Sequence, residues 1–557
     1  MKIRRILVVI FVVILMSVIA VALSGCKDKD ELGEEPPVAN VQTLEYKLNN
    51  DDTYSVIGIG SADNSEKIEI LEEYEGKSVT GIDEKAFVDC INLKILKIPA
   101  SIKYIGRNAL EGCSNLVSLT LPFLGSSIND MPNAKLSYLF GDDNIVVNLK
   151  KVVLAGGHIG DKAFYQCESI ENVTISDSTY EIGNYAFYAC NNLEAIVIPN
   201  SVKTIGNNAF EGCVKLKCID IPSSVSTIGG YAFKNCIGIQ SLTLEEGVHE
   251  IGKFAFEQCS NLAEILIPDS LIHIGISAFS SCTNLKKVVI GKGLTTIENG
   301  MFNGTIALES LEIGAKVAKI GLNAFNGCSS LKILSLPANV NEIENMAFMN
   351  CTSLIEINVD EQNTTFKGEG NCLIKGNVLV LGCKSSVIPN GVVRIKENAF
   401  KNCEGLTSIN IPSSVDEVSS QAFVGCNQLQ NFVVDSQNTK YRAESNFLIE
   451  IDSTYGDILL LAGNSEETIR RIPNTIAIIG ENSFQNCANL TNITLPSSIT
   501  EIKNNAFANC NSLTDIVFEG SKEEWISINK DNWCNFENSI TISCTDGKLD
   551  QFENELE

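Results

Sequence analysis

Apolar and polar residues alternate along this chain in a pattern that repeats every 23 residues. The repeat is most regular between residues 190 and 290, where one cysteine returns in each unit: Cys190, Cys213, Cys236, Cys259 and Cys282. Self-similarity at a fixed period of about 20–50 residues is the signature of a repeat architecture, because one unit cannot bury its apolar face until another stacks on it. The chain is therefore predicted to be one continuous solenoid rather than several globular domains.

A single unit contains two short extended segments and one tight turn. LEAIVIP (193–199) alternates apolar and polar residues, which indicates a strand with one buried face, and Pro199 ends it because proline has no N–H to donate. SVKTI (201–205) is a second extended segment, and Gly206 lets the chain turn. In AFEGC (209–213) the apolar positions are three and four residues apart, so phenylalanine and cysteine are expected to point inward from a short helical turn.

The repeated pattern L-x-x-I-x-I-P-x-x-V-x-x-I-G-x-x-A-F-x-x-C resembles the BspA-like class of leucine-rich repeats, over about residues 41–547 and in fifteen copies. The resemblance implies a leucine-rich repeat solenoid of short parallel strands and short helical turns. With one degenerate unit in each of three gaps, about eighteen rungs are expected. At a strand spacing of about 4.8 Å they would form an elongated rod of roughly 85 Å. Members of this class look like cell-surface adhesion or host-protein-binding proteins.

The start of the chain is predicted to be an export signal. Residues 1–25 have a basic start, an apolar stretch and the ending Leu23-Ser24-Gly25, and Cys26 follows directly. This ending resembles a bacterial lipobox, which implies that Cys26 is lipidated and that the protein is an extracytoplasmic lipoprotein held on the membrane only by its lipid. The alternative is an uncleaved membrane anchor, since eighteen apolar residues just reach a spanning length.

The remaining segments follow from changes in the pattern. Residues 26–40 are charged and contain two prolines, which predicts a flexible tether, and residues 41–80 begin with a hairpin signal expected to cap the first coil. The solenoid is assigned to 81–517, and residues 518–557 are assigned to a C-terminal cap, with Trp525 as its lid, and an acidic tail. Three insertions interrupt the repeat near 122–147, 359–384 and 434–464, and the last two are expected to be β-hairpins.

Charge narrows the range of partners. The chain has 42 Lys and Arg residues against 68 Asp and Glu residues, a formal net charge of −26. Such an acidic surface argues against nucleic acid and against charge-driven binding to anionic lipid, because both need positive potential. It suits solubility outside a cell and partners that are basic or neutral.

Cysteine usage offers candidate chemistry. Fourteen of the 20 cysteines occupy the repeat position, and Thr305 fills the same position once. We expect packed free thiols there, with disulfides between neighbouring rungs as the alternative. A metal site is not expected, because cysteines 23 residues apart form a line and not a tetrahedral cluster. Cys372 and Cys383 are a separate candidate disulfide, because both are missing from the third insertion, where Phe447 and Asn464 match them.

Candidate catalytic groups are scarce. The chain has three histidines, and His249 and His273 stand at positions one residue out of phase on neighbouring rungs, so they should face opposite sides. Phosphate-binding glycine loops, nucleophile elbows and metal-spaced clusters are absent from the sequence. The protein is predicted not to be an enzyme and to need no cofactor.

The remaining hypothesis is recognition through a sheet face. The residue between the last two apolar positions of L-x-x-I-x-I must point outward. In the middle of the chain this column is Val197, Asp220, Thr243, Leu266, Val289 and Glu312. Leu266 and Val289 form an apolar pair on adjacent rungs, and Glu264 and Lys287 lie in the second outward column beside them.

These residues, with Thr243 and Glu312, are the candidate contact site for a protein ligand. Two alternatives stay open. The exposed pair has no function, as is common for scattered surface apolar residues, or the whole chain is a structural spacer or envelope organiser without a dedicated ligand.

Overall fold

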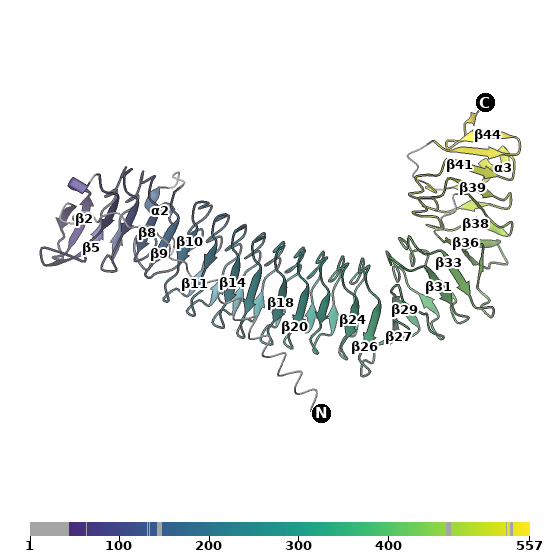
Figure 1. The fold of residues 1–557 in the computed structure, drawn as a ribbon, viewed down its shortest axis with the longest axis horizontal. Coiled ribbons are helices and arrows are strands. Elements are labelled where there is room, and N and C mark those ends of the chain that lie inside the picture. Colours follow the sequence, from purple (N-terminus) through teal and green to yellow (C-terminus); the bar gives the residue numbers. More distant parts are fainter. Residues whose placement is uncertain are drawn as a thin grey trace. The chain divides into compact units, whose positions relative to one another are not determined.

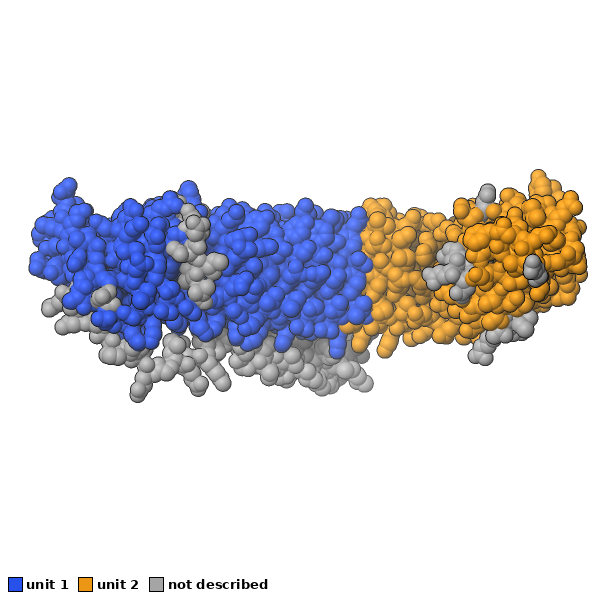
Figure 2. All heavy atoms as spheres, turned by 90° about the horizontal axis from the view of Figure 1, so that it is seen from above, with its two compact units in different colours: residues 1–306 blue, residues 307–557 orange. Residues whose placement is uncertain are grey.

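The computed structural model describes residues 44–62, 64–130, 132, 134–141, 148–463, 469–530, 532–534 and 539–556. These residues fall into two compact units, a first unit ending at Ile306 and a second unit beginning at Ala307 (Figure 2). Each unit is a β-solenoid with a 23-residue spacing between paired strands and few helices. The predicted leucine-rich repeat solenoid is confirmed.

The L-x-x-I-x-I segments form the long strands, which pair in parallel and in register with the same segment of the next repeat (Figure 1). Cys218 lies beside Ser241, and Leu266 lies beside Val289. In the first unit these strands are β3(Lys67–Glu69), β6(Ile95–Lys97), β8(Ser118–Leu121), β9(Lys151–Leu154), β10(Asn172–Thr174), β12(Ala195–Ile196), β14(Cys218–Ile221), β16(Ser241–Leu244), β18(Glu264–Ile267) and β20(Lys287–Ile290). In the second unit they are β22(Ser310–Glu312), β24(Ile333–Leu336), β26(Glu356–Val359), β31(Ser408–Ile411), β33(Asn431–Val434), β37(Ile469–Arg471), β39(Asn492–Leu495), β41(Asp515–Phe518) and β43(Thr541–Cys544).

The V-x-x-I segments form a second set of short parallel strands. Thr204 pairs with Thr227, and Glu250 pairs with His273. In the first unit this set is β5(Lys77–Ile82), β7(Tyr104–Ile105), β11(Glu181–Ile182), β13(Thr204–Ile205), β15(Thr227–Ile228), β17(Glu250–Ile251), β19(His273–Ile274) and β21(Thr296–Ile297). In the second unit it is β23(Lys319–Ile320), β25(Glu342–Ile343), β30(Arg394–Ile395), β32(Glu417–Val418), β38(Ile476–Ile479), β40(Glu501–Ile502) and β42(Asn529–Lys530).

The A-F-x-x-C segment differs from the short helical turn that its spacing predicts. In the repeat at 208–213, Asn208 and Gly212 have φ angles of 55° and 79°, in the left-handed region. The N–H of Phe210 donates to the carbonyl of Ala232 in the next repeat at 2.7 Å, whereas a helix would keep such bonds within the segment. The turn therefore joins neighbouring repeats, and its two left-handed positions favour Asn and Gly.

Phenylalanine rings form the centre of the core. In the first unit the seven rings from Phe164 to Phe302 stack with centroids 4.9–5.7 Å apart and planes within 11° of parallel. In the second unit the stacked pairs are Phe325 with Phe348, Phe400 with Phe423, and Phe484 with Phe507. The inward column is as predicted, but within the second unit it is divided at the two insertions.

The three insertions take different forms. The first contains the helix α2(Ser137–Phe140), where the carbonyl of Leu139 accepts the N–H of Leu110 at 2.9 Å. The second and third are each an antiparallel meander of three strands, one strand more than a hairpin. These strands are β27(Phe366–Glu369), β28(Cys372–Lys375) and β29(Val378–Leu381), then β34(Tyr441–Glu444), β35(Phe447–Glu450) and β36(Asp457–Ala462). The last strand of each meander continues into the short-strand sheet, because β29 pairs with β30 and β36 with β38 in parallel.

Antiparallel strands also occur at both ends of the described chain. At the start, β1(Glu45–Leu48) pairs with β2(Tyr54–Gly58), near η2(Gly60–Ala62) and β4(Glu73–Tyr74). At the end, β43 pairs with β44(Gly547–Asp550), and β44 with β45(Glu555–Leu556). The helix α3(Lys522–Ser527) carries the fully buried Trp525, whose ring meets Phe518 edge-on at 5.4 Å between centroids.

Candidate functional site

The long strands of the first unit present one outward side chain between two buried ones. On β18, Ile265 and Ile267 are 2% and 1% exposed, while Leu266 between them is 64% exposed. The inward and outward assignment made from the sequence is therefore confirmed on this strand. Because neighbouring strands are in register, the outward residues of successive repeats lie side by side.

The candidate contact residues are brought together only in part. Leu266 lies directly beside Val289, and Glu264 beside Lys287, across the β18–β20 pair. Val289 is only partly exposed, so it is less accessible than its outward position suggests.

Two further candidates lie outside that strand pair. Thr243 is exposed on β16, and its register partner is Asp220 on β14. Glu312 is exposed on β22 but belongs to the second unit. The patch that the first unit forms by itself therefore excludes Glu312.

Two apolar residues outside the predicted contact site are also strongly exposed. Val197, three repeats before Leu266 in the same outward column, is 75% exposed. Ile272, which precedes β19, is 64% exposed although it belongs to the short-strand side of the repeat. The outward column was readable from the pattern, but the degree of exposure depends on neighbouring side chains that the pattern does not specify.

Most of the repeat cysteines share one geometry. The thiol of Cys213 lies 3.2 Å from the carbonyl oxygen of Phe187, in the preceding repeat, and that of Cys236 lies 3.0 Å from the carbonyl oxygen of Phe210. The Phe187 carbonyl also accepts the N–H of Cys190 at 3.1 Å. A thiol in this geometry is a weak second donor to a buried carbonyl, a role in addition to packing that the spacing alone did not reveal.

None of the fourteen cysteines of this column forms a disulfide. Burial raises the pKa of Cys282 to about 12 and that of Cys487 to about 11. Because the thiolate is the nucleophile and the metal ligand, thiols held neutral in this way are unreactive. The column therefore contributes to the core.

The candidate disulfide between Cys372 and Cys383 is present as two free, buried thiols. Each sulfur has its own backbone acceptor: Cys372 donates to the carbonyl of Gly370 at 3.5 Å, and Cys383 donates to that of Asn371 at 3.6 Å. The two insertions can also be aligned by strand register. That alignment makes Gly463, and not Asn464, the counterpart of Cys383.

The histidines and the other possible metal ligands do not form a cluster among the described residues. The His158 ring contacts Tyr180 at 4.3 Å between centroids, and His249 and His273 are exposed. Within the described ranges no three His, Cys, Asp or Glu side chains are placed to hold a metal ion. No helix in the same ranges combines the length and apolar character that a membrane span requires. The lipidation candidate Cys26, with the predicted signal and tether, lies outside the described residues.

A stack of parallel strands, with one inward phenylalanine and one inward thiol in most repeats, defines the class as a leucine-rich repeat solenoid. The chain matches the family described as BspA type leucine-rich repeat region over residues 47–138, 157–274, 249–372, 381–452 and 464–555. The protein belongs to this family. A comparison with curated proteins gives no match.

Several solved structures are similar. A leucine-rich repeat protein from Bacteroides ovatus is 25% identical, with 73% of this chain and 100% of that chain covered and a TM-score of 0.44. A leucine-rich cell surface protein from Faecalibacterium prausnitzii is 21% identical, with 89% and 99% covered and a TM-score of 0.27. The pneumococcal vaccine antigen PcpA is 18% identical, with 65% and 87% covered and a TM-score of 0.38.

Proposed function

We propose that this protein recognises another protein through the long-strand face of its first unit, while a lipid on Cys26 holds it at the bacterial cell surface. The observation that carries the proposal is the in-register outward column, in which Leu266 is 64% exposed beside Val289. Family membership supports it, because proteins of this family are often surface proteins that take part in protein interactions.

The chemistry of the column suits a modest contact site. Leu266 and Val289 supply apolar area, and Glu264 and Lys287 place one charge of each sign beside them. Protein interfaces combine an apolar centre with a polar rim that sets orientation. Thr243 on the preceding long strand extends the same face.

A structural spacer is the second candidate function. The observation that favours it is the partial burial of Val289, which reduces the apolar area that a ligand could cover. A spacer has no specific ligand, so it retains no partner above background when envelope and extracellular-matrix proteins are passed over it.

The test is the double change Leu266→Asp and Val289→Asp in the intact chain. Both positions point away from the core, so circular dichroism and melting temperature should stay nearly unchanged, whereas binding to the purified partner found by pull-down should fall at least tenfold. Ile272→Asp is the matched control, because Ile272 has the same 64% exposure on the short-strand side. Equal binding by the double variant and the control would refute the patch.

Anchoring is tested separately. Cys26→Ala should prevent incorporation of labelled fatty acid and release the protein from the membrane fraction. Continued labelling of that variant would show that the lipid is not on Cys26.

A further inference from the structure

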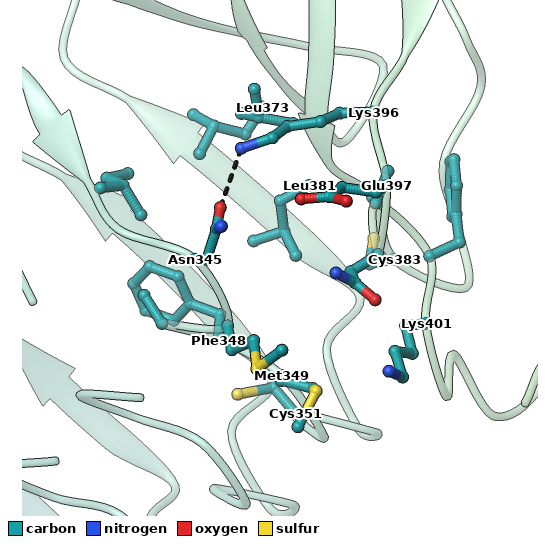
Figure 3. A pocket seen from close by; sticks show the side chains of 18 of the residues that line it. Asn345, Phe348, Met349, Cys351, Leu373, Leu381, Cys383, Lys396, Glu397 and Lys401 are labelled. Carbon is teal, nitrogen blue, oxygen red and sulfur yellow. Dashed lines mark hydrogen bonds between the residues drawn. The ribbon is translucent and has the colours of Figure 1, made fainter. Parts of the chain in front are cut away.

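The second unit contains a cavity of about 180 Å³ beside the second insertion. It lies between the turn at 343–351 and the turn at 396–403, with Leu373 and Leu381 of the insertion on one side. Figure 3 shows Leu381 between the turn that carries Phe348 and the turn that carries Lys396. All of these residues belong to the second unit.

The cavity exists because the insertion has no A-F-x-x-C turn. On one side Phe348 stacks on Phe325 at 5.3 Å between ring centroids, and on the other Phe400 stacks on Phe423 at 5.0 Å. In an uninterrupted stretch the next turn supplies a ring between such pairs. Here the insertion brings Gly382, where an added Cβ would come within 2.1 Å of the Phe400 ring, so the strand packs against that ring without a side chain of its own.

The same interruption leaves a backbone donor open. The N–H of Phe325 donates to the carbonyl of Ala347 in the next repeat at 2.8 Å. For the N–H of Phe348 no acceptor is found among the described residues; the carbonyl of Ala399, its counterpart in the next turn, accepts the N–H of Gly382 at 2.8 Å. Buried N–H groups are nearly always paired, so this donor favours a ligand that brings an acceptor.

Three lysines line the cavity, Lys375, Lys396 and Lys401. The Lys375 amine lies 5.5 Å from the centroid of the Phe366 ring. Lys396 donates to Asn345 at 3.0 Å across the opening, and Lys401 lines the wall (Figure 3). Two acidic residues, Glu344 and Glu397, also line the cavity; Glu344 is paired with Lys319, and Glu397 is exposed. The lining therefore offers an apolar interior with donors and a slight excess of positive charge.

The third insertion nearly closes the equivalent space. At the third insertion the cavity is about 30 Å³. There the Phe447 ring meets Phe484 edge-on at 5.9 Å, and the guanidinium of Arg470 lies 4.3 Å from the Phe447 centroid. The register places Cys372 at the position of Phe447, so the second insertion has a much smaller side chain there.

We propose that this cavity binds a small carboxylic acid with one planar aromatic ring. The ring would continue the stack beside Phe348, and the carboxylate would accept from the Phe348 N–H and from Lys396 or Lys401. The volume of the cavity agrees with a ligand that has one aromatic ring, because an apolar cavity of about 150 Å³ holds a benzene molecule. This site lies in the second unit and is independent of the proposed protein-binding face.

The experiment uses saturation-transfer NMR on the intact chain with 3-phenylpropanoate as the probe. The wild-type chain should give a strong signal, and 3-cyclohexylpropanoate, which has the same carboxylate on a non-planar ring, a signal at least fivefold weaker. Leu381→Phe, which places a ring in the cavity, should reduce the phenylpropanoate signal at least tenfold. Leu461→Phe at the equivalent position of the third insertion is the matched control and should leave it within twofold.

A second variant keeps the test decisive if Leu381→Phe does not fold. The double change Lys396→Gln and Lys401→Gln alters only the rim, and it should weaken phenylpropanoate binding at least fivefold. Absence of a wild-type signal, or equal signals from wild type and the rim variant, would overturn the proposal. Tighter binding of the capped peptide Gly-Gly-Phe-Gly-Gly than of the free acid would also overturn it, because the occupant would then be a side chain of a polypeptide.

Discussion

Replacing Phe256 with alanine removes one ring from the middle of the uninterrupted stack in the first unit. The ring is fully buried, and its centroid lies 5.1 Å from that of Phe233 and 5.2 Å from that of Phe279, with planes within 3° of parallel. The backbone contacts of the residue do not depend on its ring. Its N–H donates to the carbonyl of Ala278 at 2.8 Å, so the substitution isolates the contribution of the side chain.

We expect Phe256→Ala to lower the free energy of unfolding by about 4–5 kcal/mol, the upper half of the range for a buried phenylalanine. Two ring contacts are lost, each worth about 0.5–1.5 kcal/mol beyond buried area. The neighbouring rings cannot move into the space, because hydrogen bonds between turns hold successive repeats at a constant spacing. The cavity therefore stays open.

The assay is urea unfolding of the purified chain followed by circular dichroism, with native-state hydrogen exchange on residues 233–302 to locate the loss. Hydrogen exchange is needed because long repeat arrays do not always unfold in one step. Lys286→Ala, an exposed change on the same stretch, is the control and should alter the free energy by less than about 0.5 kcal/mol.

Cys259→Ser provides the comparison that tests the reasoning. The thiol lies 3.3 Å from the carbonyl oxygen of Phe233, and a serine hydroxyl can donate to the same oxygen, so the loss should be about 1 kcal/mol. A loss as large as that of Phe256→Ala, together with thiols that resist alkylation in the denatured, unreduced chain, would refute a core of packed rings and free thiols.

Two further outcomes are expected. Ser277→Gly should raise the free energy of unfolding by about 0.5–1 kcal/mol in a urea titration, because Ser277 has a φ of 54°, which glycine adopts without steric cost; a destabilised variant would contradict this. Burial raises the pKa of the Cys282 thiol to about 12, above the ordinary thiol pKa of about 8.5. The neutral thiol therefore makes its full contribution to stability below about pH 8.5. The contribution is lost as the pH rises toward 12, so melting temperatures measured between pH 8 and 11 should fall less for Cys282→Ala than for the wild type.

The repeat pattern determined the architecture because each 23-residue unit contains the same pattern of apolar, polar and turn residues. Alternation in L-x-x-I-x-I decides which face of a strand is buried, and Leu266 is exposed between two buried isoleucines as that rule requires. The inward phenylalanine follows from the same logic. Local periodicity suffices for these features because every unit meets a nearly identical neighbour.

The tertiary structure alone decided what happens where a unit is missing. The helix at Leu139 closes the first gap, Phe447 and Arg470 nearly fill the third, and the second stays open beside Leu381. The acceptor of each repeat thiol and the partial burial of Val289 were likewise not readable from the sequence. Each depends on side chains that are distant along the chain and adjacent in space, and periodicity carries no information about them once the period is interrupted.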